Sequence, residues 1–110
     1  MKVAISATGD GWDAGVDPRF GRARGFFIID TDTTQTVYLD NLDNVDAAHG
    51  AGTGAAQAVA DAGVQVVLAP RVGPKAAAVL DAAGIKVLHG VEHVSIREAY
   101  ERYQEGTLKE

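Results

Sequence analysis

Apolar residues along this chain occur in short runs separated by polar turns, and stretches rich in alanine lie between the later runs. Runs of β-branched and aromatic residues are typical of strands, whereas apolar residues at intervals of three and four are typical of helices. The pattern predicts five strands, at residues 3–6, 26–30, 36–39, 64–69 and 85–88. It also predicts three helices, at residues 50–62, 74–83 and 96–105.

Turn-forming residues separate these elements and indicate how they connect. The short polar link at residues 31–34 predicts a hairpin, so the first three strands form a meander. Gly63 and Gly84 suit helix ends, and Pro74 suits a first helical turn. Residues 40–46 are an acidic, turn-forming stretch. We therefore expect an α/β fold in which the meander precedes an α-β-α-β-α series on a five-stranded mixed sheet.

Composition narrows the class of protein. A chain of 110 residues that is 46% hydrophobic suits a single domain over residues 1–110 with a core of its own. There is no apolar run of about 18 residues and no signal-peptide pattern, so we expect a soluble cytoplasmic protein without a membrane partner. The lack of cysteine excludes disulfides, thiolate catalysis and cysteine-ligated clusters. A net charge of -5 argues against nucleic acid as a partner.

The predicted topology gathers basic residues at one edge of the sheet. Loops that follow strands running in the direction of the first strand all lie at that edge, and they cover residues 8–24, 40–54, 70–73 and 89–94. These loops carry Arg19, Arg22, Arg71, His49, His89 and His93, and the three helix N-termini lie beside them. Ligands of open α/β sheets bind outside the carboxyl ends of parallel strands, and helix N-termini attract anions. The edge is therefore a predicted anion pocket.

The loop at residues 8–24 is long, and its segment 17–24 holds three arginines in an acidic protein. A proline restricts the backbone of this segment and a glycine lets it change direction, so we expect a shaped loop. Arg19, Arg22 and Arg24 can converge on one anion there. A solvated basic turn is the alternative interpretation.

A second candidate segment, residues 49–54, leads into the first predicted helix. Gly50 and Gly52 can expose backbone N–H groups to a bulky ligand, with Thr53 beside them. His49 is a candidate metal ligand or hydrogen-bond donor at the mouth of the pocket. The glycine spacing differs from the dinucleotide-binding motif, and a flexible helix N-terminus is the alternative.

Residues that would indicate catalysis do not form a recognisable set. The early carboxylates lie in a loop instead of on the first strand, where a two-metal nuclease would need one. Ser6 has no evident base partner. His89 and His93 lack the spacing of a helical zinc site and are interpreted as structural or solvated. Trp12 is expected to pack its loop onto the body of the protein.

The segment DPRFGRA at residues 17–23 resembles the dinitrogenase iron-molybdenum cofactor biosynthesis family, and the resemblance covers almost the whole chain. The other motifs that carry it are KVAI at 2–5, HGAG at 49–52, GVQVV at 63–67, VGP at 72–74 and AAGIKV at 82–87. The resemblance implies a ribonuclease H-like fold that lacks the nuclease carboxylates. This agrees with the order of elements that the hydrophobic pattern predicts.

The resemblance also implies a carrier, not an enzyme, that binds an anionic metal-sulfur cluster without covalent bonds. The family includes nitrogenase cofactor carriers and the orange protein of sulfate reducers. The cluster is then an iron-molybdenum or iron-sulfur precursor, or a molybdenum-copper sulfide, and partners are donor and acceptor proteins of cluster assembly. The family's site residues are the arginine loop and the His49 segment, to which the topology adds Arg71. Two alternatives remain open: an enzyme or sensor that binds a nucleotide or small anion at the same edge, and a protein-interaction module.

Overall fold

The computed structural model describes residues 1–45 and 50–110, and its elements follow the predicted order. The strands are β1 (Lys2–Ala7), β2 (Gly25–Asp30), β3 (Thr36–Asp40), β4 (Val66–Leu68) and β5 (Lys86–Leu88). The helices are α1 (Leu42–Val45), α2 (Ala51–Asp61), α3 (Pro74–Ala82) and α4 (Ile96–Glu105). None of the helices in the described part of the chain is long and apolar enough to cross a membrane.

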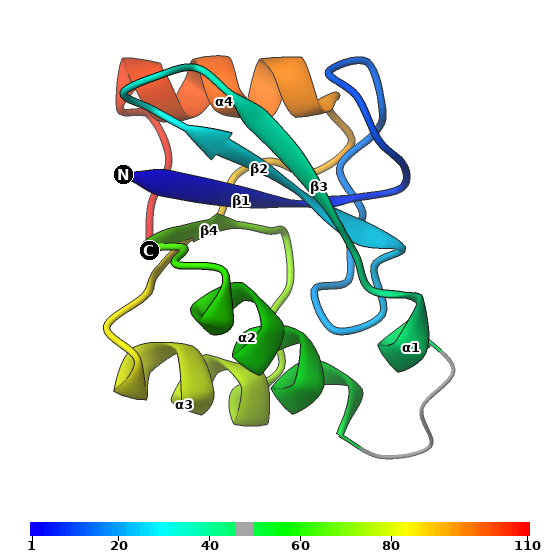
Figure 1. Ribbon diagram of the computed structural model, residues 1–110. Coiled ribbons are helices and arrows are strands. Elements are labelled where there is room, and N and C mark those ends of the chain that lie inside the picture. The colour runs from blue at the N-terminus through cyan, green and yellow to red at the C-terminus, as the bar shows by residue number, and fades with distance from the viewer. Residues whose placement is uncertain (46–49) are drawn as a thin grey trace.

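The five strands form one mixed sheet in the order β3-β2-β1-β4-β5. Strands β1, β2 and β3 pair antiparallel as the predicted meander, whereas β4 and β5 extend the sheet parallel to β1. Helices α2 and α3 cover one face of the sheet and α4 covers the other (Figure 1). The predicted α/β, ribonuclease H-like fold is confirmed.

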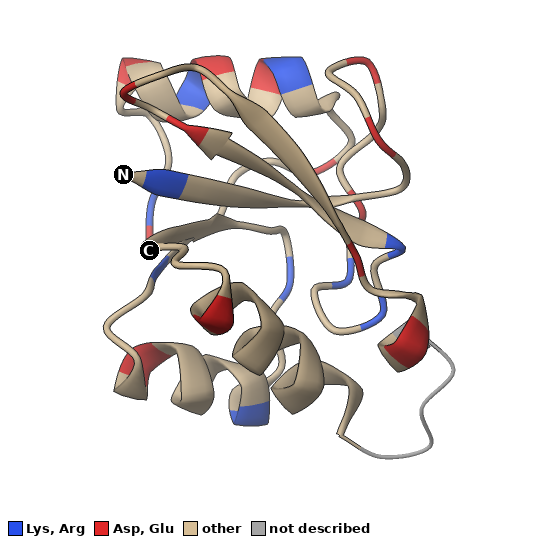
Figure 2. Cartoon of the chain, viewed as in Figure 1, with Lys and Arg blue, Asp and Glu red and all other residues tan. Residues whose placement is uncertain are grey.

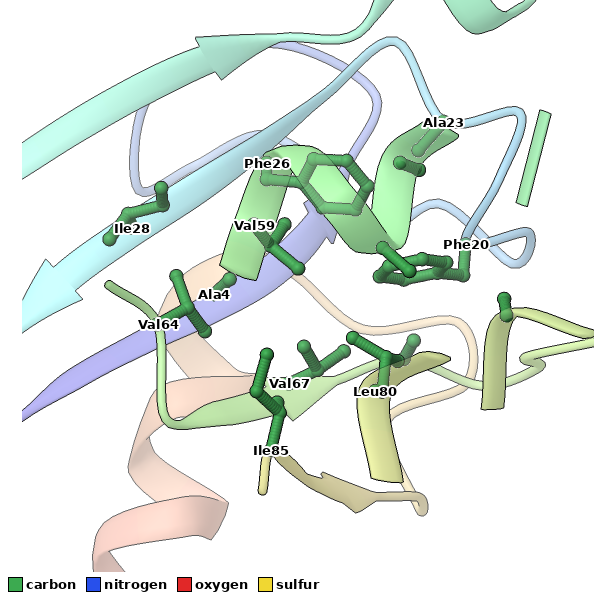
Figure 3. Close-up of a cluster of buried hydrophobic side chains, with 14 residues drawn as sticks. Ala4, Phe20, Ala23, Phe26, Ile28, Val59, Val64, Val67, Leu80 and Ile85 are labelled. Atoms are coloured by element: carbon green, nitrogen blue, oxygen red, sulfur yellow. The ribbon is translucent and has the colours of Figure 1, made fainter. Parts of the chain in front are cut away.

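Two apolar clusters, one on each face, hold the layers together. Central strand β1 contributes to both because its side chains alternate: Ala4 faces the α2 and α3 side, while Val3 and Ile5 face the α4 side. Figure 3 shows the first cluster, in which Phe20 lies close to side chains of the helical layer. Phe20 belongs to the arginine loop, residues 17–24, and is 1% exposed. The core itself therefore anchors that loop.

Two elements differ from the sequence prediction by more than one residue at an end. The acidic stretch at 40–46 contains the one-turn helix α1, because the Asp40 side chain accepts the backbone N–H of Leu42 at 2.7 Å and caps the turn. The predicted strand at 64–69 is shorter, since β4 covers Val66–Leu68. The flanks of β4 remain hydrogen bonded, as Gln65 N–H donates to the Lys2 carbonyl at 2.9 Å.

Trp12 packs residues 8–16 against the α4 face, as predicted. Its ring makes an edge contact with Phe27 at 5.0 Å between centroids, lies 5.6 Å from the Tyr100 ring, and has the Arg97 guanidinium above it at 5.7 Å. The loop backbone is fixed as well, because the Trp12 carbonyl accepts the Arg97 N–H at 2.9 Å.

Trp12→Ala is expected to lower the free energy of unfolding by about 2 kcal/mol, below the range for a fully buried tryptophan because this ring is half-buried. Trp12→Phe should lose less than half of that, since it keeps an aromatic contact. Urea denaturation followed by circular dichroism measures both variants. An unchanged free energy of unfolding in Trp12→Ala would contradict the packing role of the indole ring.

Candidate functional site

Asp17 shapes the start of the arginine loop. Its carboxylate, with a side chain 6% exposed, accepts the backbone N–H of Arg19 at 2.9 Å and lies 3.7 Å from Arg19 Nε. The Ser6 hydroxyl donates to the Asp17 carbonyl at 2.8 Å. These contacts tie the loop to strand β1, so the side chain of Arg19, which is 59% exposed, projects from a fixed backbone.

The backbone next brings Arg19 beside Arg71. The two residues form an isolated parallel β-bridge, and the Phe20 N–H donates to the Arg71 carbonyl at 3.1 Å. Arg71 lies between β4 and α3, more than fifty residues further along the chain. The predicted convergence of these two arginines at one edge of the sheet is therefore present in their backbones.

The loop then passes very close to the helical layer at Gly21. A Cβ atom there would lie 2.6 Å from Gly52 Cα and 2.7 Å from Gly52 N, and one at Gly52 would lie 3.1 Å from the Ala76 Cβ. Loop, α2 and α3 therefore meet through small residues. Backbone atoms therefore form the surface at this point, and larger side chains would push the three segments apart.

Asn41 holds the loop from the other side, and the sequence analysis did not identify it. This buried side chain donates through Nδ2 to the carbonyls of Gly21 at 3.1 Å and Ala23 at 2.9 Å. Asn44 on α1 donates in turn to Asn41 Oδ1 at 2.8 Å. A lone asparagine after a strand carries no sequence signal for such a role, because its partners come from a distant loop.

Two helix N-termini face this region without side-chain caps in the described part of the chain. Gly50 precedes α2 and Gly73 precedes α3, and neither first turn has a side-chain acceptor there. Such turns leave N–H groups that favour an anion. The third helix start that the sequence predicts at this edge is not available to an anion, because the backbone N–H groups in the first turn of α4 already have acceptors. Its N–H groups at residues 96, 97 and 98 donate to Ala14 O, Trp12 O and Ser95 Oγ.

These parts surround a cavity of about 450 Å³. Its lining residues are Arg19, Phe20, Gly21, Arg22, Gly50, Ala51, Gly52, Arg71 and Gly73. We call it the arginine cavity. Three arginines line it, and among the described residues that line it none is acidic, although the net charge of the chain is -5. Figure 2 shows basic positions in the loops beside the starts of α2 and α3.

Not every predicted site residue lines the cavity. Arg24 immediately precedes β2 and lies near Tyr38. Burial raises the pKa of Tyr38, the charge of Asp40 raises it further, and the charge of Arg24 opposes both effects. Thr53 lies in the first turn of α2 and donates its hydroxyl to the Gly50 carbonyl at 3.1 Å. His49 lies outside the described residues, so its role as ligand or donor stays a prediction.

The two remaining histidines take different positions. His89 is half-buried, and its Nδ1 lies 2.8 Å from the Ala69 carbonyl, which indicates a structural role. His93 is exposed and lines a second cavity together with Arg19 and Arg71. Across residues 1–45 and 50–110, no three His, Asp or Glu side chains are grouped so that they could hold a metal ion.

Comparison with known proteins assigns the chain to a family. The family profile described as dinitrogenase iron-molybdenum cofactor matches residues 1–106. The chain belongs to the dinitrogenase iron-molybdenum cofactor family. One relative, protein MJ0580 of Methanocaldococcus jannaschii, is 30% identical over 111 residues. The alignment covers 99% of this chain and 90% of the relative.

Solved structures agree with this assignment to the dinitrogenase iron-molybdenum cofactor family. The apo form of the orange protein from Desulfovibrio gigas is 44% identical, with a TM-score of 0.95 and coverage of 98% of this chain and 90% of that one. The NMR structure of Thermotoga protein TM1290 is 35% identical, with a TM-score of 0.88 and coverage of 99% and 91%. The resemblance that the arginine loop indicated is confirmed at the level of the family.

Proposed function

We propose that this protein binds and carries an anionic metal-sulfur cluster without covalent bonds to it. The observation that carries the proposal is the arginine cavity, which three arginines and the starts of α2 and α3 line, with no acidic residue and no side-chain helix cap there among the described residues. The volume, about 450 Å³, lies within the range of about 300–1,000 Å³ typical of small-molecule sites. The chain has no cysteine, so the cluster would arrive complete with its own sulfide.

Each group has a specific role in this proposal. Arg19, Arg22 and Arg71 donate charge-assisted hydrogen bonds to sulfide, each contributing about 1.5 to 3 kcal/mol. The backbone at Gly50 and Gly52 donates N–H groups, and the neighbouring histidine at position 49 serves as a ligand or donor. Binding alone satisfies this role, so the protein is not an enzyme. Donor and acceptor proteins of cluster assembly are its partners.

The cluster is either a molybdenum-copper sulfide or an iron-molybdenum or iron-sulfur precursor. Membership in the cofactor family supports the iron-molybdenum or iron-sulfur precursor. Likeness to the orange protein makes that protein the direct comparison for the molybdenum-copper sulfide. In both cases the cargo is a compact polyanion with sulfide on its surface. Guanidinium groups and backbone N–H groups recognise that surface through charge and hydrogen bonding.

Anaerobic reconstitution tests the proposal. The purified protein is mixed with tetrathiomolybdate and copper, and separately with iron and sulfide, then passed through gel filtration and analysed by visible spectroscopy and metal analysis. A coloured, stoichiometric cluster that co-elutes with the protein is the expected result, and its metals identify the cargo.

A small-anion or nucleotide-binding enzyme or sensor is the second candidate, because helix N-termini without a side-chain cap, such as those of α2 and α3 among the described residues, also bind phosphate. It predicts protein that stays colourless in both reconstitutions, while phosphate or a nucleotide raises its melting temperature without metal. That pair of results would replace the carrier function with this one.

A further inference from the structure

A second cavity adjoins the arginine cavity and shares Arg19 and Arg71 with it. Its volume is about 490 Å³, and it is lined by Val16, Pro18, Arg19, Pro70, Arg71, Glu92 and His93. The two shared arginines lie side by side, since their backbones form an isolated parallel β-bridge, and both residues line each cavity. One ligand can therefore contact both cavities around this arginine pair.

The second cavity differs from the first in its chemistry. It adds the carboxylate of Glu92 and the imidazole of His93, both exposed, to the two shared arginines, and its remaining lining residues are valine and proline. A ligand that is anionic over its whole surface suits the arginine cavity but is repelled by a carboxylate at the far end. The combined site therefore matches a ligand with an anionic body and one electropositive side.

His93 is held in place for such a contact. Its backbone has φ 60°, in the left-handed region, where histidine is enriched several-fold among residues other than glycine. The next residue, Val94, accepts the Val16 N–H at 2.9 Å, and Gly15 is bridged to Ser95. The arginine-bearing loop and the His93 loop are thus joined through backbone contacts at the two residues that follow His93.

We infer that the cargo presents a coordinatively open, thiophilic metal ion toward His93, which binds it through an imidazole nitrogen. This rests on the proposed carrier function, adds one coordinate bond to its non-covalent contacts, and specifies its cargo as a sulfide cluster with an exposed metal edge. The neutral imidazole donates a lone pair to the metal in place of a water or small thiol ligand, with no change of oxidation state. Glu92 balances the positive edge, and copper(I) is the probe because imidazole and sulfide are both among its preferred ligands.

The test compares two ligands, tetrathiomolybdate alone and tetrathiomolybdate loaded with copper(I), on wild type and His93→Gly. Glycine keeps the left-handed backbone, so the fold is retained while the imidazole is lost. We expect His93→Gly to bind tetrathiomolybdate within about twofold of wild type and the copper-loaded ligand at least about tenfold more weakly. Added imidazole should restore much of that loss. Copper X-ray absorption should show a nitrogen neighbour in wild type that is missing from the variant.

Matched variants sharpen the result. His89→Gln removes a histidine that lines neither the arginine cavity nor the second cavity, and it should bind both ligands as wild type does. Glu92→Gln should bind tetrathiomolybdate more tightly and the copper-loaded ligand less tightly, because it removes a negative charge. These opposite shifts would support a bipolar site.

Three outcomes would overturn the inference. Equal binding of the copper-loaded ligand by wild type and His93→Gly would show that His93 does not contact the metal. An equal loss for both ligands without rescue by imidazole would indicate a structural role for His93. Failure of wild type to bind either ligand would overturn the carrier function itself, and the inference with it.

Discussion

Replacing Arg19 and Arg22 together with alanine is expected to abolish retention of the cluster on gel filtration. Both guanidiniums line the arginine cavity, and each charge-assisted hydrogen bond contributes about 1.5 to 3 kcal/mol. Losing two such bonds weakens binding by about 3 to 6 kcal/mol, which corresponds to roughly 10² to 10⁴ in the dissociation constant. Titration of the reconstituted protein, followed by visible absorbance, measures this change.

The control for this pair of substitutions changes the charge equally at a distant place. Arg97→Ala with Arg102→Ala removes two arginines from α4, which lies on the opposite face of the sheet from α2 and α3 (Figure 1). We expect that variant to retain the cluster. Equal weakening in both pairs would mean that net charge, and not the arginine cavity, holds the cluster. The Arg19 and Arg22 pair should keep the wild-type circular dichroism spectrum.

Gly21→Ala is expected to destabilise the protein by about 3 kcal/mol, an overpacking cost in which a methyl group meets backbone. The new Cβ would lie 2.6 Å from Gly52 Cα, and α2 cannot move away freely because Gly52 already packs against Ala76. The shift that relieves the clash separates the arginine loop from the start of α2. Weaker cluster binding should therefore accompany the loss of stability.

Gly9→Ala is the matched control, since a Cβ at position 9 has nothing within 4 Å and its backbone is not in the left-handed region. It should be neutral, or stabilising by about 0.4–1 kcal/mol through reduced entropy of the unfolded chain. Urea denaturation of both variants gives the comparison. Similar unfolding free energies for the two variants would contradict the close approach of loop and helix.

Much of the fold follows from local pattern, because each predicted strand and helix has its own periodicity and its own turn residues. The one-turn helix at residues 42–45 escaped prediction for a physical reason. It has no apolar periodicity, and its cap from Asp40 resembles any acidic turn. The strand at 66–68 was overestimated because burial continues beyond the paired residues.

The candidate site was predictable where topology alone decides position. Arg19, Arg22 and Arg71 lie around one cavity because their loops follow strands that end at the same edge of the sheet. Arg24 does not line it, since the place of a residue in a loop does not fix the direction of its side chain. The Asn41 clamp depends on carbonyls twenty residues away, a contact that no local motif specifies.

The arginine cavity is assembled from three segments that are far apart in sequence, near residues 20, 51 and 72. A nascent chain that has emerged only as far as β3 would carry Arg19 and Arg22 but neither helix start nor Arg71. Unfinished or unfolded chains would therefore compete poorly for a scarce metal cofactor. Under the proposed carrier function, cargo uptake would report on completed folding, and bound cargo would in turn protect the last strands from proteolysis by stabilising the native state.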